Sequence, residues 1–220
     1  MKLKIITTVG LTLLIALITG CSGASVMDTK VSSKQARIIF DVPKTVDTET
    51  LTKALYDSVS IRVSDLTESE GLMPEVLPDT PAGPTQNQGA MRLMAMTGGG
   101  NASMSMMALD TSNSYYWVMG KGKSESEYMS RSESYKAAIY PYKDGYKIYM
   151  YLFYTEGTDG ILGNLTSAAV NSIVGQDGAI LFIAQARDQF MKEVPSAKVL
   201  SQSPQKLNNV NLNAIGWSAN

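Results

Sequence analysis

The sequence predicts an α+β protein, in which a curved antiparallel sheet packs against a C-terminal helix and an N-terminal strand–helix–strand unit precedes the sheet. Two compositional features lead to this fold class. Ten of the eleven tyrosines lie between Tyr115 and Tyr154, and this aromatic content favours β-strands in that region. After Gly157 the composition changes to one that favours helices. We expect a single domain over residues 35–200.

The N-terminal unit is predicted from its hydrophobic spacing. Residues 36–42 form a strand-like run that Pro43 ends. Asp47 or Thr48 is a suitable N-cap for a following helix. Helical spacing places four apolar residues of that helix on one face: Leu51, Ala54, Leu55 and Val59. Residues 60–66 then alternate as a second strand.

An insertion over residues 71–110 is predicted next. Four prolines between Gly71 and Gly89 indicate a long loop. Residues 89–109 are rich in Met, Ala, Gly and Ser, and their pattern fits two strands, a short helix or mobile chain equally well.

The tyrosine-rich region contains the clearest strand signals. Residues 115–119 form one strand, and Asp144-Gly145 between two strand-like runs predicts a hairpin turn. Residues 146–154 are apolar on both faces, as expected of the central strand. Residues 124–135 alternate without an apolar face, which favours a solvated or edge ribbon, with a disordered Ser-rich loop as the alternative.

Helical patterns dominate the C-terminal part. Residues 164–174 are a weak candidate, whereas residues 178–194 have Asp177 as a cap and Pro195 as a stop. Residues 197–200 form a short strand, and residues 201–220 are rich in Asn, Ser and Gln, as in a polar tail.

The N-terminus has the pattern of an export signal. Lys2 and Lys4 precede an apolar run over residues 5–18, which is shorter than the about 20 apolar residues that span a bilayer. The run ends in Leu17-Ile18-Thr19-Gly20-Cys21. This resembles the signal of bacterial lipoproteins, although Ile18 stands where Leu is more usual.

The resemblance implies cleavage between Gly20 and Cys21, followed by a diacylglycerol thioether on Cys21 and acylation of the new amine. Residues 1–20 are then the signal peptide and residues 21–34 a lipidated tether. Ser22, rather than Asp, follows Cys21, and this favours the periplasmic face of the outer membrane over the inner membrane. The competing interpretations are an ordinary secretory signal with a chance Cys, and a buried core Cys.

Composition excludes several functions. With no His and one Cys, the chain has no Ser-His-Asp or Cys-His catalysis and no internal disulfide. Its net charge of −1, which becomes −3 when the signal takes away Lys2 and Lys4, gives no electrostatic basis for binding nucleic acid. We expect the carboxylate pairs to be solvated, in turns or on the polar ribbon; these are Glu125 with Glu127, Glu68 with Glu70, and Glu156 with Asp159. We therefore expect no enzymatic activity.

Methionine is the unusual residue of this sequence, because seven of thirteen lie between Met91 and Met119. Closely spaced thioethers are typical of Cu(I) sites. The candidate ligands are Met94, Met96, Met104, Met106 and Met107. Methionine also supplies adaptable apolar surface for a core or a partner.

Together these features favour a lipid-anchored, non-catalytic binding or assembly module of the cell envelope. Its expected partners are the membrane and an envelope protein, and its expected cofactor is none beyond the lipid on Cys21. The alternatives are a Met-rich Cu(I)- or Ag(I)-binding protein, and a carrier of an apolar ligand in a sheet–helix groove.

Overall fold

The computed structural model describes residues 32–61, 63–96, 102–122, 133–156, 178–205 and 207. Residues 31–220 make up one compact unit. The predicted signal, Cys21 and the weak helix 164–174 lie outside the described residues.

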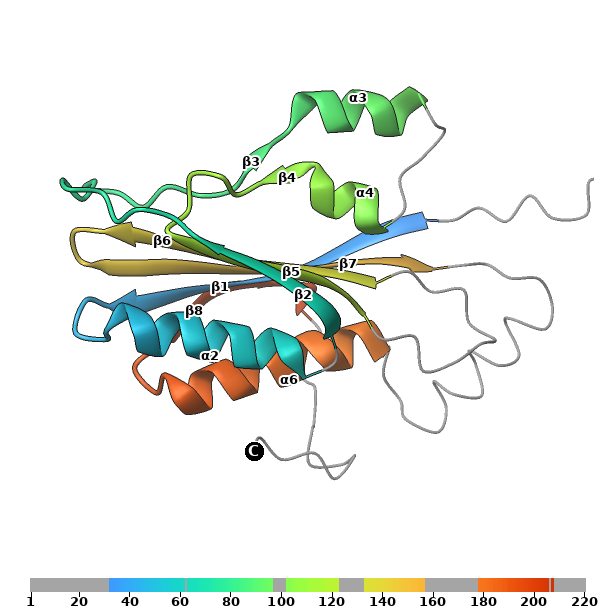
Figure 1. Ribbon diagram of the computed structural model, residues 1–220. Helices are drawn as coiled ribbons and strands as arrows, with labels where there is room; N and C mark the ends of the chain where they lie inside the picture. The colour runs from blue at the N-terminus through green and yellow to red at the C-terminus, as the bar shows by residue number, and fades with distance from the viewer. Residues whose placement is uncertain are drawn as a thin grey trace, which may run out of the picture. The chain divides into compact units, whose positions relative to one another are not determined.

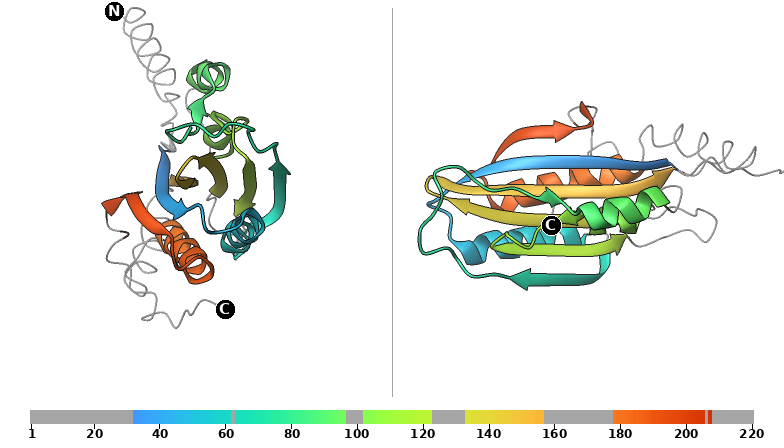
Figure 2. Two further views of the ribbon diagram at one scale, coloured as in Figure 1. Left: turned by 90° about the vertical axis from the view of Figure 1, so that its left-hand side faces the viewer. Right: turned by 90° about the horizontal axis from the view of Figure 1, so that it is seen from above.

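The fold is α+β, as predicted. Six antiparallel strands form one sheet in the order β2-β5-β6-β7-β1-β8 (Figure 1). The strands are β1 (Ser32–Pro43), β2 (Val63–Glu70), β5 (Tyr116–Gly122), β6 (Glu133–Tyr142), β7 (Gly145–Glu156) and β8 (Lys198–Ser203). Two helices, α2 (Thr48–Ser60) and α6 (Gly178–Glu193), pack side by side against one face of this sheet (Figures 1 and 2).

The main core lies between the sheet and these two helices. Successive side chains of a strand point to opposite faces, so every second residue of β1 and β7 enters this core. Ile38 and Phe40 of β1 and Ile148 and Leu152 of β7 are fully buried there. The Phe40 ring lies 4.9 Å from the ring of Phe190 on α6. β7 lies between β6 and β1 inside the sheet, which confirms the prediction that residues 146–154 form the central strand.

Helix α2 begins as its sequence predicts. The backbone N–H of Thr50 donates to Asp47 Oδ1 at 2.7 Å, so Asp47 is the N-cap and satisfies one of the free donors of the first turn. The predicted apolar face, Leu51, Ala54, Leu55 and Val59, is buried.

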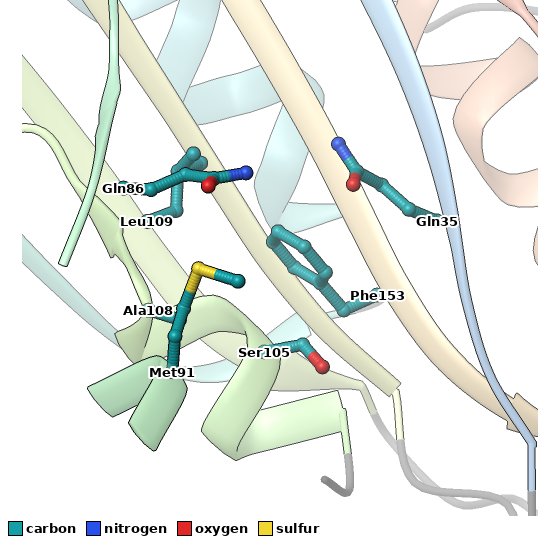
Figure 3. Close-up of a pocket in the computed structure, with 7 residues that line it drawn as sticks. All are labelled: Gln35, Gln86, Met91, Ser105, Ala108, Leu109 and Phe153. Atoms are coloured by element: carbon teal, nitrogen blue, oxygen red, sulfur yellow. The ribbon is translucent and has the colours of Figure 1, made fainter. Parts of the chain in front are cut away.

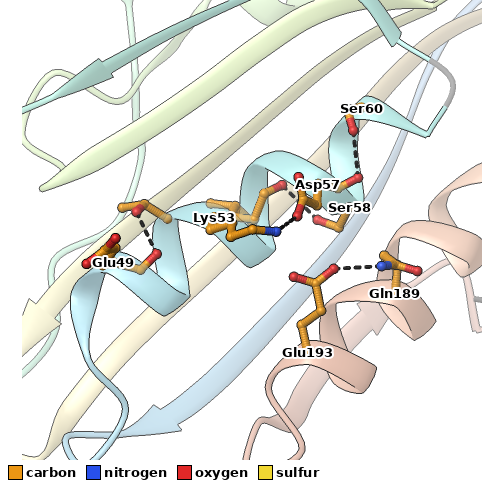
Figure 4. A network of polar contacts seen from close by, with 9 residues as sticks. Glu49, Lys53, Asp57, Ser58, Ser60, Gln189 and Glu193 are labelled. Atoms are coloured by element: carbon orange, nitrogen blue, oxygen red, sulfur yellow. Dashed lines mark hydrogen bonds and ion pairs between the residues drawn. The ribbon is translucent and has the colours of Figure 1, made fainter. Parts of the chain in front are cut away.

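Polar contacts line the outer surfaces of both helices (Figure 4). Lys53 and Asp57 form an ion pair one helical turn apart, and Gln189 Nε2 donates to Glu193 Oε1 at 2.6 Å. Polar pairs at a solvated helix surface contribute little to stability. These contacts are ordinary features of solvated helix faces.

The C-terminal segment is more structured than its composition predicts. α6 ends at Glu193, just before Pro195, as expected. However, β8 pairs with β1 and continues to Ser203, and Leu207 is fully buried. The predicted polar tail therefore begins as a strand, because backbone pairing with β1 does not require apolar side chains.

The β6–β7 hairpin corrects the predicted turn by one residue. Tyr142 pairs with Gly145, so the two loop residues are Lys143 and Asp144. A Cβ atom on Gly145 would lie 2.1 Å from the carbonyl oxygen of Val42. Gly145 is therefore required by the close approach of β1 and β7.

The predicted edge ribbon is wrong for its described part, residues 133–135, which belong to β6 in the interior of the sheet. Tyr135 packs on Phe182 of α6 with ring centroids 4.1 Å apart, and Ser134 is buried on the other face. α6 covers one face of this part of β6 and α4 covers the other, so residues without an apolar face are buried. Residues 124–132 lie outside the described residues.

Asp41 joins three strands at one end of the sheet. Its Oδ1 accepts hydrogen bonds from Tyr142 Oη at 2.7 Å and from Lys147 Nζ at 3.0 Å. Burial alone would raise the pKa of Asp41, but these two hydrogen bonds and the positive charges of Lys147 and Lys198 together lower the pKa below its usual value. The ionised carboxylate therefore stabilises the fold.

We expect Asp41→Asn to cost about 1–2 kcal/mol of stability at pH 7. Because the folded-state pKa of Asp41 lies below the unfolded value of about 3.9, its contribution is present above that pH and is lost as the pH falls through the folded-state pKa. Thermal unfolding of both proteins from pH 7 to pH 2 measures this. Asp79→Asn, which removes an exposed ion pair with Lys143, is the control. A difference for Asp41→Asn that is independent of pH would contradict the prediction.

Candidate binding site

The insertion between β2 and β5 covers the sheet face opposite α2 and α6 (Figures 1 and 2). It contains β3 (Thr85–Gln86), α3 (Gln88–Met96), α4 (Ala102–Met107) and β4 (Leu109–Asp110). Residues 71–84 are a long loop, as predicted, but the last part of the loop predicted up to Gly89 contains β3 and the start of α3. The undecided segment 89–109 thus contains two short helices.

Asn87 connects the start of α3 by hydrogen bonds to Ala108, the residue that follows α4. Its Oδ1 accepts from the backbone N–H of Ala90 at 3.1 Å, and its carbonyl accepts from Met91 at 3.0 Å. Its own N–H donates to the carbonyl of Ala108 at 2.7 Å. One residue therefore caps α3 and ties the two halves of the insertion together.

A row of aromatic rings on β7 forms the floor beneath the insertion. Tyr149, Tyr151 and Phe153 occupy alternate positions, and neighbouring rings stack with centroids 6.3 Å and 6.1 Å apart. Ala102 and Met106 of α4 pack on Tyr151 and Phe153, and these four residues form a second buried cluster. The insertion therefore has a small apolar core of its own.

Polar groups are also buried under the insertion. Lys136 Nζ donates to the carbonyl of Leu109 at 2.6 Å and lies 6.0 Å from the centre of the Trp117 ring. Burial lowers the pKa of Lys136. The Tyr140 hydroxyl is buried with no hydrogen-bond partner among the described residues. An unsatisfied buried hydroxyl costs about 1–3 kcal/mol.

A cleft of about 210 Å³ opens between the insertion and the sheet (Figure 3). Gln86 and Met91 point into it from the insertion, toward Gln35 of β1 and Phe153 of β7. Its lining residues are Gln35, Gln86, Met91, Ser105, Ala108, Leu109 and Phe153. The volume is that of about seven liquid waters, below the usual range for drug-sized ligands. It suits a single apolar side chain or the end of a short acyl chain.

The chemistry of the cleft is apolar with a neutral polar rim. None of its lining residues carries a charge. The Gln35 and Gln86 carboxamides each offer donors and an acceptor, and the Met91 thioether and the Phe153 ring provide apolar contact. This arrangement binds a neutral group by burial and orients it by hydrogen bonds.

A second hollow, of about 640 Å³, lies between α6 and β8 and is open and polar. Arg187 at its wall donates to Asp188 at 2.8 Å and to the carbonyl of Leu207 at 3.0 Å. Arg187 thus holds the C-terminal segment against α6, and this hollow is the weaker candidate.

The methionines that the sequence singles out have different environments. Met106 is buried in the aromatic cluster, whereas Met96 and Met107 are 85 % and 68 % exposed. Met104 is half-buried, and the side chain of Met94 is outside the described residues. The described residues include no group of three His, Cys, Asp or Glu side chains that would hold a metal ion. A Cu(I) site on the methionines stays a prediction.

Of the carboxylate pairs, Glu68 and Glu70 do not lie in a turn. Both are exposed on the edge strand β2 and accept hydrogen bonds from the hydroxyls of Tyr116 and Tyr115. They therefore tie β2 to β5. Glu125, Glu127, Asp159 and the side chain of Glu156 are outside the described residues.

Sequence reasoning did not identify Gln35, Gln86, Ser105 or Phe153 as site residues. One signal was present: residues 146–154 are apolar on both faces, and the predicted helices cover only one of them. The aromatic residues of the other face require a second covering layer.

Comparison with known protein families, curated proteins and solved structures finds no match. Within the described part of the chain, no helix is long and apolar enough to cross a membrane.

Proposed function

We propose that this protein is a non-catalytic binding module, anchored to the periplasmic face of the outer membrane by a lipid on Cys21. The anchor rests on the lipobox-like residues 17–21. Binding rests on one observation, the uncharged cleft between the insertion and the sheet.

The cleft favours an apolar side chain of an envelope protein as its ligand. An aromatic or aliphatic side chain fits the space between Met91 and Phe153, since methionine adapts to irregular shapes. The Gln35 and Gln86 carboxamides at the rim provide the donors and acceptors that a neighbouring peptide group requires.

Photo-cross-linking in cells tests this proposal. A photoreactive phenylalanine analogue at Gln86 is expected to give one discrete adduct with an envelope protein. Gln35→Trp, which places a large ring beside its strand partner Phe153, is expected to lower the adduct yield at least about tenfold by filling the cleft. The matched control places the same analogue at Lys198, an exposed position on β8.

Equal adducts at Gln86 and Lys198, or a yield that Gln35→Trp leaves unchanged, would contradict a binding site in the cleft. Thermal unfolding of the Gln35→Trp protein shows whether the fold is retained.

A carrier of a small apolar ligand is the second candidate, because the same lining suits a short acyl chain. Native mass spectrometry of the protein purified from envelopes then finds a bound small molecule, and Gln35→Trp removes it. If the purified protein carries no bound small molecule, the carrier proposal is contradicted.

A further inference from the structure

Helices α3 and α4 expose apolar side chains on the outer surface of the insertion. Three residues, which we call the α3–α4 patch, are unusually exposed for their type: Leu93 (54 %), Met96 (85 %) and Met107 (68 %). They lie on two helices that contact each other. Exposed apolar residues on neighbouring helices indicate a contact surface.

The charge of this segment is unusual. Residues 80–109 contain one charged side chain, Arg92, in a protein in which 18 % of residues are charged. Arg92 lies on α3 among the patch residues. A segment without carboxylates and with one cation meets a bilayer of anionic lipids at low electrostatic cost.

The start of β1 lies beside this patch. Gln35, near the beginning of β1, lines the same cleft as Met91 of α3 and Ser105 of α4 (Figure 3). Ser32, the first residue of β1, follows Cys21 by eleven residues. Eleven residues reach at most about 40 Å. A lipid on Cys21 would therefore hold the bilayer within about 40 Å of the end of the sheet that carries the patch.

We propose that the α3–α4 patch is a membrane-docking surface, which rests on the lipid surface that holds the anchor. This inference depends on the proposed lipid anchor for its location in the cell. Met96 and Met107 enter the interface between headgroups and acyl chains, and Arg92 contacts phosphate groups. α2 and α6, on the opposite side of the sheet, then face away from the membrane (Figure 2).

The test uses an artificial tether, so that it does not require acylation in the cell. Residues 21–220 with Cys21→Ser and an N-terminal hexahistidine tag are bound to phosphatidylethanolamine–phosphatidylglycerol vesicles that contain a nickel-chelating lipid. Because the chain has no His and no other Cys, the tag is the only tether and an introduced cysteine the only thiol. A polarity-sensitive fluorophore is attached through Met96→Cys or, on the opposite face, through Lys53→Cys.

Docking predicts that the label at position 96 shifts to shorter wavelength on vesicles and is quenched by brominated lipids, while the label at position 53 does neither. Leu93→Ser with Met107→Ser should lower the ratio of docked to undocked protein at least about tenfold. Leu72→Ser with Val76→Ser, two comparably exposed apolar residues of the 71–84 loop, should leave it unchanged.

Equal spectra at positions 96 and 53, or a shift that appears only at high protein density on the vesicles, would overturn the docking surface. The second result would indicate contact between copies of this chain. Absence of a lipid on Cys21 in cells would refute the anchor and leave the vesicle result standing, so the two failures are distinguishable.

Discussion

Cys21→Ser is expected to abolish acylation and to leave the protein as the unprocessed precursor. Lipoprotein maturation, as the resemblance implies, requires a thiol for the thioether and cuts only after that lipid is attached. The chain has no other Cys that would take its place. Two or more acyl chains anchor a protein stably, so the loss of this residue is expected to remove the proposed lipid anchor.

Metabolic labelling with an alkyne-bearing fatty acid, followed by fractionation and a mass measurement of the N-terminus, checks this prediction. Gly20→Ala keeps a small residue before the cysteine and is the matched control, with processing and labelling as in the natural protein. A Cys21→Ser protein that is still cut between residues 20 and 21 would show that an ordinary secretory signal is present.

Phe190→Ala is expected to cost about 3–5 kcal/mol of folding free energy. Phe190 is fully buried and packs on Phe40, so truncation leaves a cavity where α6 meets β1. For a domain of this size the loss lowers the melting temperature by about 6–20 °C. Natural domains are stable by only about 5–15 kcal/mol, so the change takes away a large part of the total.

Calorimetry or denaturant unfolding measures this effect. Phe190→Leu, which keeps most of the apolar volume, is the control and should cost clearly less. A double-mutant cycle with Phe40→Ala should give a coupling of about 0.5–1.5 kcal/mol for the ring pair. A loss below about 1 kcal/mol in Phe190→Ala, well under the cost of truncating a buried aromatic ring, would mean that α6 does not pack as described.

The main sheet and α2 were predictable because local and long-range signals agree there. Asp47 caps α2, and Leu51 and Leu55 recur at helical spacing on the face that is buried. Strand β7 was predicted as central because both of its faces are apolar, and both faces are covered. In these elements periodicity alone identifies which side chains are inside.

The insertion was not predictable in the same way. Gly, Ala, Ser and Met in residues 89–109 have no consistent period, and α3 and α4 are too short to show one. The buried residues of α4, Ala102 and Met106, pack on rings of β7, far along the chain. The cleft depends on this packing, so Gln35 and Gln86 have no recognisable signal in the sequence.

Two local errors have the same origin. Ser134 is buried although its neighbours in the sequence are polar, because Ser103 of α4 contacts it, with the two hydroxyl oxygens 3.2 Å apart. The hairpin was placed one residue late because Asp144-Gly145 matches a turn dipeptide, whereas Gly145 is needed next to Val42. In each case a distant segment decides the local structure.

The position of β1 inside the sheet has a consequence for how the chain folds. β1 pairs on one side with β7, where Ser32 meets Glu156, and on the other with β8 near the C-terminal end. β1, the first of the described strands, therefore stays unpaired until Gly145, at the start of β7, has been synthesised. Such distant pairings slow folding, because the chain between the two strands loses entropy when it closes into a loop, before the contacts between the strands stabilise it. Should the chain be exported as we propose, β1 cannot be paired on both edges before β8, the last of the described strands, has also crossed the membrane.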